Sequence, residues 1–480
     1  MVVGEATIET EVAVIGGGPG GYAAAFRAAD LGLEVTLIEL EERLGGVCLL
    51  RGCIPSKTLL YLSNLIYDAG RAGDMGVRFG RPAIDIQGVR EWKDRVIDRL
   101  TTGLQTLSRK RDIQRIQGRA TFESSNRVRV TGTETTHVKF GHAILATGSH
   151  AIPLPGIAPS TGSVPRFEAG GRVMSSTGAL ELADIPERLL VVGAGYVGLE
   201  LGSVYATLGS RVTAVELSGE LLPGTDRDLV RPLERRTRET FEAVYLNTRV
   251  AALAERQDHV RVTLEGQVEE PEQTFDRVLV AIGRKPNSAG IGLEHTAVEV
   301  DERGFVQVDD QRRTADRRIF AVGDVVGGMM LAHKAMHEGK VAAEVIAGRP
   351  AAFDVQAIPA VVYTDPQIAW AGLLEHQVPA DREAVVARFP WAASGRAVSM
   401  GAPEGLTKMV FEPRTERILG VGIVGREAGE MIAEGVLAIE MGAVAEDLAL
   451  SIHAHPTLSE TEEEAAGAFL GHATHVLPSS

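Results

Sequence analysis

The sequence predicts an α/β protein with two Rossmann-like domains and a smaller C-terminal domain of the α+β type. Three observations predict this class. A short apolar strand, a G-x-G-x-x-G turn and an Ala-rich helix follow one another near the N-terminus. The same order recurs 177 residues later, where Gly193 takes the place of Gly16. From about Ala351 onward, the chain reads as a mixture of strands and helices.

The first of the two units has the features of a dinucleotide site. We expect strands at Glu11–Ile15 and Glu34–Ile38, a helix at Tyr22–Leu31, and a carboxylate after the second strand at Glu39. The turn contains Gly16, Gly18, Gly20 and Gly21. Its first glycine allows a tight turn, its middle one lets the backbone approach a pyrophosphate, and its last one lets helix and strand pack closely. The helix N-terminus then faces the phosphates, and the acid accepts hydrogen bonds from a ribose.

The second unit repeats the pattern with strands at Arg188–Val192 and Arg211–Val215 and a helix at Leu199–Leu208. Its turn comprises Gly193, Ala194, Gly195, Tyr196, Val197 and Gly198. The acid Glu216 would bond a 2′-hydroxyl and repel a 2′-phosphate, and no Arg occurs in the next three residues. Two units predict two dinucleotides, the second being NAD(H) rather than NADP(H). A duplication with one inactive copy is the alternative.

The chain has two cysteines, Cys48 and Cys53, in a C-x4-C pair. A structural zinc site would need four ligands, and a structural disulfide is typical of secreted proteins. A pair that switches between dithiol and disulfide is therefore favoured over two unreactive buried thiols. Positions i and i+5 are too far apart in a straight helix for a disulfide, so we expect an irregular helix start, which Gly52 and Pro55 permit. Lys57 would favour a thiolate at Cys53.

Composition limits the classes of function. A length of 480 residues suggests three or four domains, and the 44% hydrophobic content is that of a globular protein with a sizeable core. The net charge of −15 argues against nucleic acid or an anionic membrane surface as partner. It fits either simple solubility or an acidic patch for a basic protein. No stretch is apolar enough for a membrane span and no leader is evident, so we expect a cytoplasmic protein.

With these motifs placed, the chain resembles the flavoprotein disulfide reductases, and among them the dihydrolipoamide dehydrogenases, from about Ile8 to Glu463. Further motifs carry the resemblance: Ala146-Thr147-Gly148, Ala281-Ile282-Gly283-Arg284, Ile319-Phe320-Ala321-Val322-Gly323-Asp324 and Leu331-Ala332-His333-Lys334-Ala335. The resemblance implies a flavin domain at 1–155 with the redox cysteines, an NAD domain at 156–285, a second flavin part at 286–352 and a dimerisation domain at 353–480.

The resemblance also implies which residues hold the two cofactors. The FAD site would comprise Gly16, Gly18, Gly20, Gly21, Glu39, Gly46, Lys57, Gly118, Thr147, Gly148, Asp324 and Ala332. The NAD site would comprise Gly193, Gly195, Tyr196, Val197, Gly198, Glu216, Val250 and Gly283. Asp324 would hold the ribityl chain. Tyr196 would move aside for the nicotinamide, with simple helix packing as the alternative. His333 is expected to be a packing or solvated histidine.

The catalytic residues implied by the resemblance are Cys48, Cys53, His455, Glu460, Lys57 and Glu200. In H-x-H-P-T-x-S-E, the second histidine would be the acid–base, oriented by the glutamate and acting on the disulfide of the other subunit of a homodimer. Cys48 would face the substrate and Cys53 the flavin, and Lys57 would pair with Glu200 near the reactive flavin edge. The first histidine, His453, is expected to be structural.

The implied reaction is oxidation of protein-bound dihydrolipoamide, with NAD⁺ as acceptor. Partners would be lipoyl domains and the acyltransferase core of 2-oxo acid dehydrogenase complexes, or the H protein of glycine cleavage. An NADH-dependent, flavin-bearing reductase of another small disulfide is the alternative enzyme, and a flavin-bearing assembly subunit is the alternative from another class. Mutating both cysteines would separate enzyme from scaffold. Arg51 departs from the usual pattern and would add a cation beside the redox pair.

Two further expectations concern the flanking chain. Apolar residues recur at spacings of three and four between Val89 and Leu107, which predicts an amphipathic helix facing a core. This stripe comprises Val89, Trp92, Val96, Leu100, Leu104 and Leu107. The tail after Ala466 carries no motif and is expected to fray.

Overall fold

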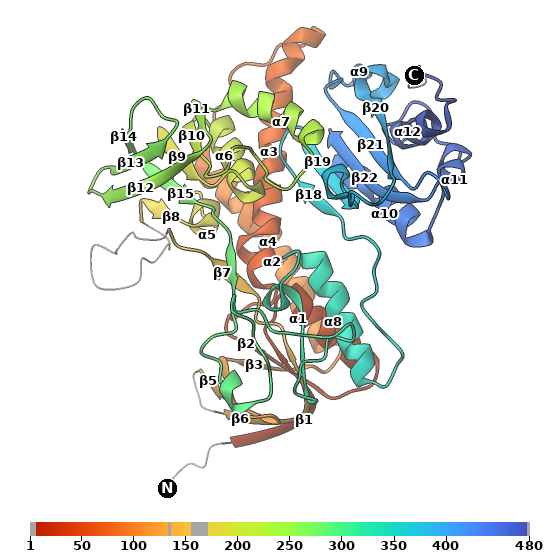
Figure 1. Cartoon of the computed structure of the whole chain (residues 1–480). Helices are drawn as coiled ribbons and strands as arrows, with labels where there is room; N and C mark the ends of the chain where they lie inside the picture. Colours follow the sequence, from red (N-terminus) through yellow and green to blue (C-terminus); the bar gives the residue numbers. More distant parts are fainter. Residues whose placement is uncertain (1–5, 133–135, 155–170, 478–480) are drawn as a thin grey trace. The chain divides into compact units, whose positions relative to one another are not determined.

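The computed structural model describes residues 6–132, 136–154 and 171–477, and it divides into two compact units (Figure 1). The first unit contains residues 1–58, 85–153 and 282–354. The second contains residues 59–84, 154–281 and 355–480. The finer division into four stretches stays a prediction.

The first unit is built on a mainly parallel sheet with the strand order β3-β2-β1-β6-β5-β4 and with β17 beside β6. The strands are β1 (Ala6–Ile15), β2 (Val35–Glu39), β3 (Gln114–Gln117), β4 (Arg119–Ser124), β5 (Arg127–Thr131), β6 (Thr136–Leu145) and β17 (Ile319–Ala321). β1 pairs in parallel with β2 and β6, whereas β5 is antiparallel to both β4 and β6. Two short strands, β7 (Ser149–Ala151) and β16 (Arg284–Pro286), pair separately.

Alternate residues of β1 belong to the two faces of this sheet, as the period of a strand requires. Val12 and Val14 are buried in one core cluster and Ala13 and Ile15 in the other. The first face is covered by α1 (Pro19–Asp30) and α8 (Ala332–Ile346), which lie side by side (Figure 1). A Cβ at Gly20 would lie 3.1 Å from the carbonyl oxygen of Ala335, so this glycine serves the packing of the two helices.

The predicted amphipathic helix is present as α4 (Ile86–Arg109), but the predicted buried face is only partly right, because Leu104 packs against a core cluster whereas three other members are exposed. Trp92 is 53% exposed, Leu100 41% and Leu107 43%. The buried residues of α4 are instead Lys93, Ile97, Thr101 and Ser108. The spacing of apolar residues shows only that a helix has an apolar and a polar face. Which face is buried depends on the elements against which the helix packs, here including α2 (Gly46–Arg51).

The second unit contains a parallel sheet with the order β11-β10-β9-β15-β8 and a small antiparallel sheet, β12-β13-β14. The strands are β8 (Val173–Met174), β9 (Arg188–Val192), β10 (Arg211–Val215), β11 (Ala243–Tyr245), β12 (Thr248–Glu255), β13 (Val260–Gly266), β14 (Glu272–Phe275) and β15 (Arg277–Val280). The helices are α5 (Ser176–Leu180), α6 (Tyr196–Leu208) and α7 (Arg227–Thr240). The second predicted strand–turn–helix–strand unit is thus present as β9, α6 and β10.

The C-terminal part of this unit is an antiparallel sheet with the order β18-β19-β22-β21-β20, accompanied by helices. The strands are β18 (Ala360–Val362), β19 (Gln367–Gly372), β20 (Val385–Pro390), β21 (Leu406–Phe411) and β22 (Ile418–Gly425). The helices are α9 (Gly395–Ser399), α10 (Ala428–Met441), α11 (Ala445–Ala449) and α12 (Glu460–Leu470). The α/β class with a C-terminal α+β part is confirmed. Across the described ranges, no helix combines the length and apolar character needed to cross a bilayer.

The expectation that the chain frays after Ala466 is wrong up to residue 477. Helix α12 continues to Leu470, and the chain then turns back onto it. The backbone N–H groups of Thr474 and His475 donate to Glu464, and Nδ1 of His475 lies 2.6 Å from its Oε1. A carboxylate on the helix therefore holds the following segment, although that segment has no recognisable motif.

Candidate functional site

The two glycine turns have the same geometry. Gly16 and Gly193 both have positive φ values, +107° and +98°. A Cβ at Gly21 would overlap the carbonyl oxygen of Gly16, and a Cβ at Gly198 would overlap that of Gly193. The first and last glycine of each turn are therefore required by the fold itself. This is the close helix–strand packing that the motif predicts.

The middle glycines are different, because nothing in the fold requires them. A Cβ at Gly195 would meet no atom within 4 Å, and one at Gly18 would meet only the Cα of Gly46, at 3.8 Å. Each of these glycines is the N-cap of its helix, and neither helix start has a side-chain cap. Both turns thus leave open space in front of uncapped N–H groups. That arrangement suits the phosphates of a dinucleotide.

The acid after each second strand makes matching contacts. Glu39 accepts the N–H of Gly17 and, at 2.9 Å, that of Glu41. Glu216 accepts the N–H of Ala194 at 2.8 Å and that of Ser218 at 2.9 Å. In each copy the carboxylate is fixed between the glycine turn and its own strand end. It therefore stands beside the turn, as a ribose-binding acid must.

Several other residues predicted to bind FAD lie around the first turn. The N–H of Gly118 donates to the carbonyl oxygen of Glu39 at 2.9 Å. A Cβ at Gly16 would overlap the backbone of Ala146, just before Thr147 and Gly148. The hydroxyl of Thr147 donates to the carbonyl oxygen of Asn287 at 2.8 Å, and the amide of Asn287 donates back to Thr147. These contacts fix the loop after β6 next to the glycine turn.

Asp324 lies in the short helix Gly323–Val326, just before α8 begins at Ala332. Its carboxylate accepts the hydroxyl of Ser149, which in turn accepts Nε of Arg284 at 2.7 Å. Behind this turn, the wholly buried Glu338 accepts the N–H of Gly323 at 2.7 Å. Lys334 and Arg312 neutralise Glu338, at 2.8 and 2.9 Å.

The cysteines lie on two helices that meet at a break. Cys48 is on α2 (Gly46–Arg51), and Cys53 is the first residue of α3 (Cys53–Arg71). Between them, Gly52 has φ −144° and ψ −111°, and a Cβ there would lie 2.8 Å from the carbonyl oxygen of Val47. The predicted irregular helix start is thus present. Cys48 is partly buried and Cys53 is exposed.

The surroundings of the pair act on the thiol of Cys48. A hydrogen bond with Cys53, burial and the nearby charge of Cys53 raise the pKa of Cys48, against a smaller lowering by Lys57. Cys48 therefore retains its proton. Burial and the charges of both cysteines also raise the pKa of Tyr22 to about 12. Arg51 is bound to Glu41 at 2.9 Å, so much of its charge is balanced away from the thiols.

The helix that carries Cys48 is joined to the first glycine turn by backbone contacts. The N–H of Gly45 donates to the carbonyl oxygen of Gly17 at 2.8 Å. Gly46 has φ +57°, and a Cβ there would lie 2.6 Å from the Cα of Gly18. A side chain at Gly46 therefore does not fit against the backbone of the turn. A dinucleotide bound at the first turn would therefore lie next to the redox helix.

His455 and Glu460 form the predicted pair. Nδ1 of His455 lies 2.8 Å from Oε1 of Glu460, whose other oxygen accepts the N–H of Thr457 at 2.6 Å. Burial would raise the pKa of Glu460, but these hydrogen bonds hold it below its ordinary value. The side chain of His455 is 73% exposed. With Nδ1 donating to the carboxylate, Nε2 is left as the basic nitrogen.

His453 has the structural surroundings expected of it. Nε2 lies 2.7 Å from Glu434, and Nδ1 lies 2.8 Å from the carbonyl oxygen of Ser451. Burial would lower its pKa, but these acceptors raise it above the ordinary value. Both ring nitrogens face acceptors, which favours the imidazolium form of this histidine.

The contacts of the remaining predicted site residues do not test the roles predicted for them. Glu200 is buried on α6 and accepts the N–H of Tyr363 at 2.9 Å. Its predicted pairing with Lys57 stays a prediction, as does the movement of Tyr196, which is 43% exposed at the start of α6. Val250 lies on β12 beside a register shift opposite Leu264. Gly283 has φ +123°. His333 is exposed.

Comparison with known proteins decides the family. Residues 10–339 match the family described as pyridine nucleotide-disulphide oxidoreductase, and residues 358–466 match its dimerisation domain. The chain belongs to this family. It is 46% identical over 470 residues to a dihydrolipoyl dehydrogenase of Vibrio parahaemolyticus, covering 97% of each chain. Identity to that of Vibrio cholerae is 45% over 467 residues, covering 97% of this chain and 96% of the relative.

The solved structures agree with this assignment. LpdA from Mycobacterium tuberculosis matches with a TM-score of 0.86 at 26% identity, covering 95% of this chain and 99% of that one. The resemblance drawn from the motifs is confirmed, and the alternative of a reductase for another small disulfide is not favoured. As a pyridine nucleotide-disulphide oxidoreductase, the protein is an enzyme that uses FAD and NAD(H), and its dimerisation domain supports the expected homodimer.

The sequence analysis did not predict the residues whose side chains support the Gly323 turn and Asp324. Glu338, Lys334 and Arg312 support the Gly323 turn, and Ser149 fixes Asp324. Glu338, Arg312 and Ser149 lie outside the motifs named above, and Lys334 lies in one of them without a predicted role. The spacing of Lys334 and Glu338, four residues apart on one helix, was the only available signal, and it is commonplace on helix surfaces.

Proposed function

We propose that this chain is the dihydrolipoyl dehydrogenase of a lipoyl-dependent enzyme complex. It would oxidise protein-bound dihydrolipoamide to lipoamide and pass the electron pair to NAD⁺. The observation that carries the proposal is the backbone contact between the cysteine helix and the first glycine turn, at Gly45–Gly17 and Gly46–Gly18. This contact supports a cycling dithiol beside a site suited to a flavin dinucleotide.

The protein's own groups account for the thiol chemistry. His455, its Nδ1 engaged by Glu460, accepts the proton of one substrate thiol at Nε2. The substrate thiolate attacks Sγ of Cys48, the Cys48–Cys53 bond breaks, and Cys53 leaves as a thiolate. The second substrate thiol loses its proton and displaces Cys48 from the mixed disulfide, which releases cyclic lipoamide. The first glycine turn and Glu39 would hold FAD, which would supply an acceptor for the electron pair of the dithiol and a hydride donor for NAD⁺.

The residues present also support the choice of nucleotide. Glu216 keeps a carboxylate beside the second turn through the N–H groups of Ala194 and Ser218. A 2′-phosphate would face this negative charge, whereas a 2′-hydroxyl can donate to it. NAD(H) is therefore the proposed nucleotide.

The proposed partners are lipoyl domains and the acyltransferase core of a 2-oxo acid dehydrogenase complex, or the H protein of glycine cleavage. In the homodimer, His455 of one subunit would serve the cysteine pair of the other. A cytoplasmic location stays a prediction. It fits a disulfide that must be reduced in every cycle.

Steady-state turnover tests the proposal. NADH formation is followed with dihydrolipoamide and NAD⁺, and in parallel NADPH is supplied with oxidised glutathione. We expect FAD-dependent turnover only with the lipoyl pair, and its loss in Cys53→Ser. Turnover of glutathione, or lipoyl turnover that survives Cys53→Ser, would refute the proposed function.

A further inference from the structure

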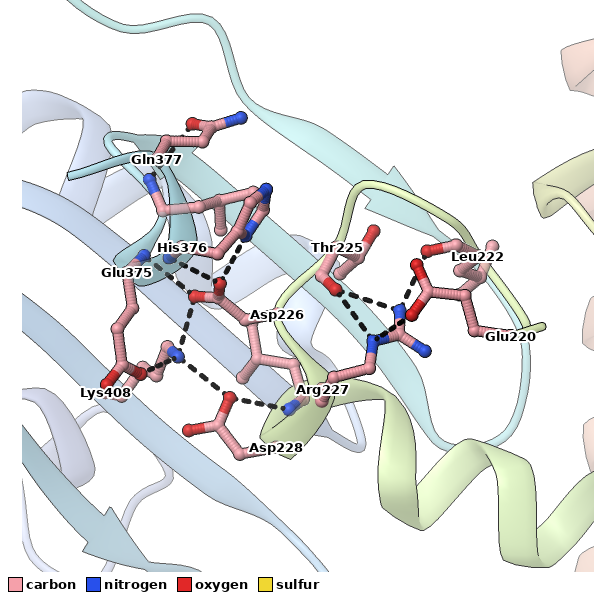
Figure 2. Close-up of polar contacts among 12 residues, drawn as sticks. Glu220, Leu222, Thr225, Asp226, Arg227, Asp228, Glu375, His376, Gln377 and Lys408 are labelled. Carbon is pink, nitrogen blue, oxygen red and sulfur yellow. Dashed lines mark hydrogen bonds and ion pairs between the residues drawn. The ribbon is translucent and has the colours of Figure 1, made fainter. Parts of the chain in front are cut away.

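Lys408 is a buried cation in the C-terminal sheet. It lies on β21 between β20 and β22, and it is 1% exposed. Its ammonium lies 2.6 Å from Asp226, 2.8 Å from Asp228 and 2.9 Å from Glu375 (Figure 2). A lysine in such a position costs several kcal/mol unless its charge is matched and its three protons are bonded. Here three carboxylates satisfy both conditions.

A second layer of contacts completes this group, which we call the Lys408 cluster: Asp226, Asp228, Glu375, His376, Arg388 and Lys408. Nε of Arg388 donates to Asp228 at 2.9 Å, and its NH2 donates to Glu375. Asp226 accepts the N–H groups of Glu375 and His376 at 3.0 and 3.1 Å. Burial would raise the pKa of Asp226, but the bonds from Lys408 and His376 lower it to about 2.

The cluster joins two segments that are distant in sequence. Glu375, Arg388 and Lys408 belong to the C-terminal sheet region, whereas Asp226 and Asp228 flank the start of α7 in the nucleotide part. The three carboxylates lie within 4.8 Å of one another, a spacing that a metal ion could use. Because the ammonium of Lys408 binds all three, the matching cation is part of the chain itself.

Between the two aspartates, Arg227 closes the loop that precedes α7. Its guanidinium donates to the carbonyl oxygens of Leu221 and Leu222, each at 3.0 Å, and to that of Thr225 at 2.9 Å. It also lies 3.2 Å from the carboxylate of Glu220 (Figure 2). These bonds fold the loop of residues 217–226 onto Arg227. The sequence neighbours of Arg227, Asp226 and Asp228, both belong to the Lys408 cluster.

The other end of this loop reaches the second glycine turn. The N–H of Leu222 donates to the carbonyl oxygen of Ala194 at 3.1 Å. The Oγ of Ser218 lies 2.9 Å from the carbonyl oxygen of Glu220 and 3.0 Å from a carboxylate oxygen of Glu216, so its proton can bond either one. An unbroken series of contacts therefore runs from Lys408 through Asp226, Arg227 and Leu222 to the turn and its acid.

We propose that Lys408 is a positioning residue for the second dinucleotide site. By anchoring loop 217–226 to the C-terminal sheet, it holds the Gly193–Gly198 turn and Glu216 in the geometry that binds the adenosine half of the nucleotide. The inference rests on the proposed NAD site, but it assigns to the C-terminal sheet a role in nucleotide affinity. Lys408 contacts neither the nucleotide nor the reacting atoms, so the chemical step does not depend on it.

The test compares Lys408→Met with the wild-type, FAD-loaded dimer. We expect the KM for NAD⁺ to rise about tenfold, the change that follows from losing one bond to the loop, with kcat within about twofold. The Kd for NAD⁺, measured by calorimetric titration, should rise by the same factor. Reduction of the flavin by dihydrolipoamide without NAD⁺ should keep its wild-type rate. The calorimetric result does not depend on the lipoyl substrate, so it separates this inference from the proposed function.

Two variants separate positioning from stability. Trp391→Phe weakens the same C-terminal core, because the wholly buried Trp391 donates to Thr407 at 2.9 Å, but it leaves the cluster intact. It should lower the melting temperature without changing the Kd for NAD⁺. Arg388→Met removes the more exposed cation and should raise that Kd by a smaller factor than Lys408→Met. If Lys408→Met does not fold, the Kd of Arg388→Met for NAD⁺ provides the test. An unchanged Kd in folded Lys408→Met or Arg388→Met, or an equal rise in Trp391→Phe, would overturn the inference.

Discussion

Two alanine substitutions three residues apart should affect different properties. One should lower the affinity for NAD⁺, and the other should lower the stability of the fold. In Gly195→Ala the new methyl group meets no atom within 4 Å, and φ is −76°, which alanine adopts without strain. In Gly198→Ala the methyl group overlaps the carbonyl oxygen of Gly193 and lies 3.1 Å from Val191. The first substitution therefore fills the space that we propose for a phosphate, and the second disrupts the packing of the fold.

The magnitudes follow from these contacts. For Gly195→Ala, the small loss at an N-cap and the gain from a less flexible unfolded chain nearly cancel, so the free energy of unfolding should change by less than about 0.5 kcal/mol. Displacing the phosphate should remove a charge-assisted hydrogen bond of about 1.5–3 kcal/mol, a loss of roughly 10- to 100-fold in NAD⁺ affinity. Gly198→Ala should destabilise by about 1–3 kcal/mol or more, because the overlap is with backbone.

The assay pairs urea unfolding of the FAD-loaded protein with calorimetric titration of NAD⁺. Reduction of the flavin by dihydrolipoamide is the internal control, since it does not involve the second turn. Wild-type NAD⁺ affinity in Gly195→Ala would refute the assignment of the open space to a phosphate. Wild-type stability in Gly198→Ala would refute the packing argument.

Three further predictions concern single side chains. Glu216→Gln removes the charge that repels a 2′-phosphate, so the preference in kcat/KM for NAD⁺ over NADP⁺ should fall about tenfold in kinetics with both nucleotides; an unchanged preference contradicts it. His455→Gln should slow reduction of the flavin by dihydrolipoamide about 10²- to 10⁴-fold and leave its reduction by NADH unchanged, which stopped-flow absorbance separates. Burial and the charge of Glu434 raise the pKa of Glu462 well above its ordinary value of 4.5, and within the described part of the chain neither of its carboxyl oxygens has a hydrogen-bond partner. The folded protein thus keeps a proton that the unfolded chain releases, so stability falls as the pH rises above 4.5 towards the folded pKa. Glu462→Gln should abolish this fall in thermal melts across that pH range, and an unaltered pH profile would show that Glu462 ionises normally.

Elements that depend on local backbone geometry, such as glycine turns and the strands beside them, could be predicted from the sequence. The strands β9 and β10 have the predicted bounds, because apolar runs before and after a glycine turn leave little choice. Helix α1 begins at Pro19, earlier than the predicted Tyr22, because proline is preorganised for the first turn of a helix. The break at Gly52 followed from the spacing of the two cysteines.

Features that depend on distant parts of the chain were not predictable. The burial of Lys93 rather than Trp92 on α4 depends on what packs there, and the apolar stripe includes residues that this packing leaves exposed. The Lys408 cluster gathers charges from segments some 180 residues apart, and no local pattern signals a lysine in a strand as buried. Sequence therefore predicts the glycine turns, whereas the charged contacts around them depend on the tertiary structure.

The central claim is that electrons pass from a dithiol substrate through Cys48 and Cys53 to a flavin at the first glycine turn. Anaerobic single-turnover reduction of the flavin tests it most directly, with wild type, Cys48→Ser and Cys53→Ser each mixed with dihydrolipoamide or with NADH. We predict that dihydrolipoamide reduces the flavin of the wild type alone, whereas NADH reduces the flavin of all three. Reduction of either cysteine variant by dihydrolipoamide at the wild-type rate would contradict the account.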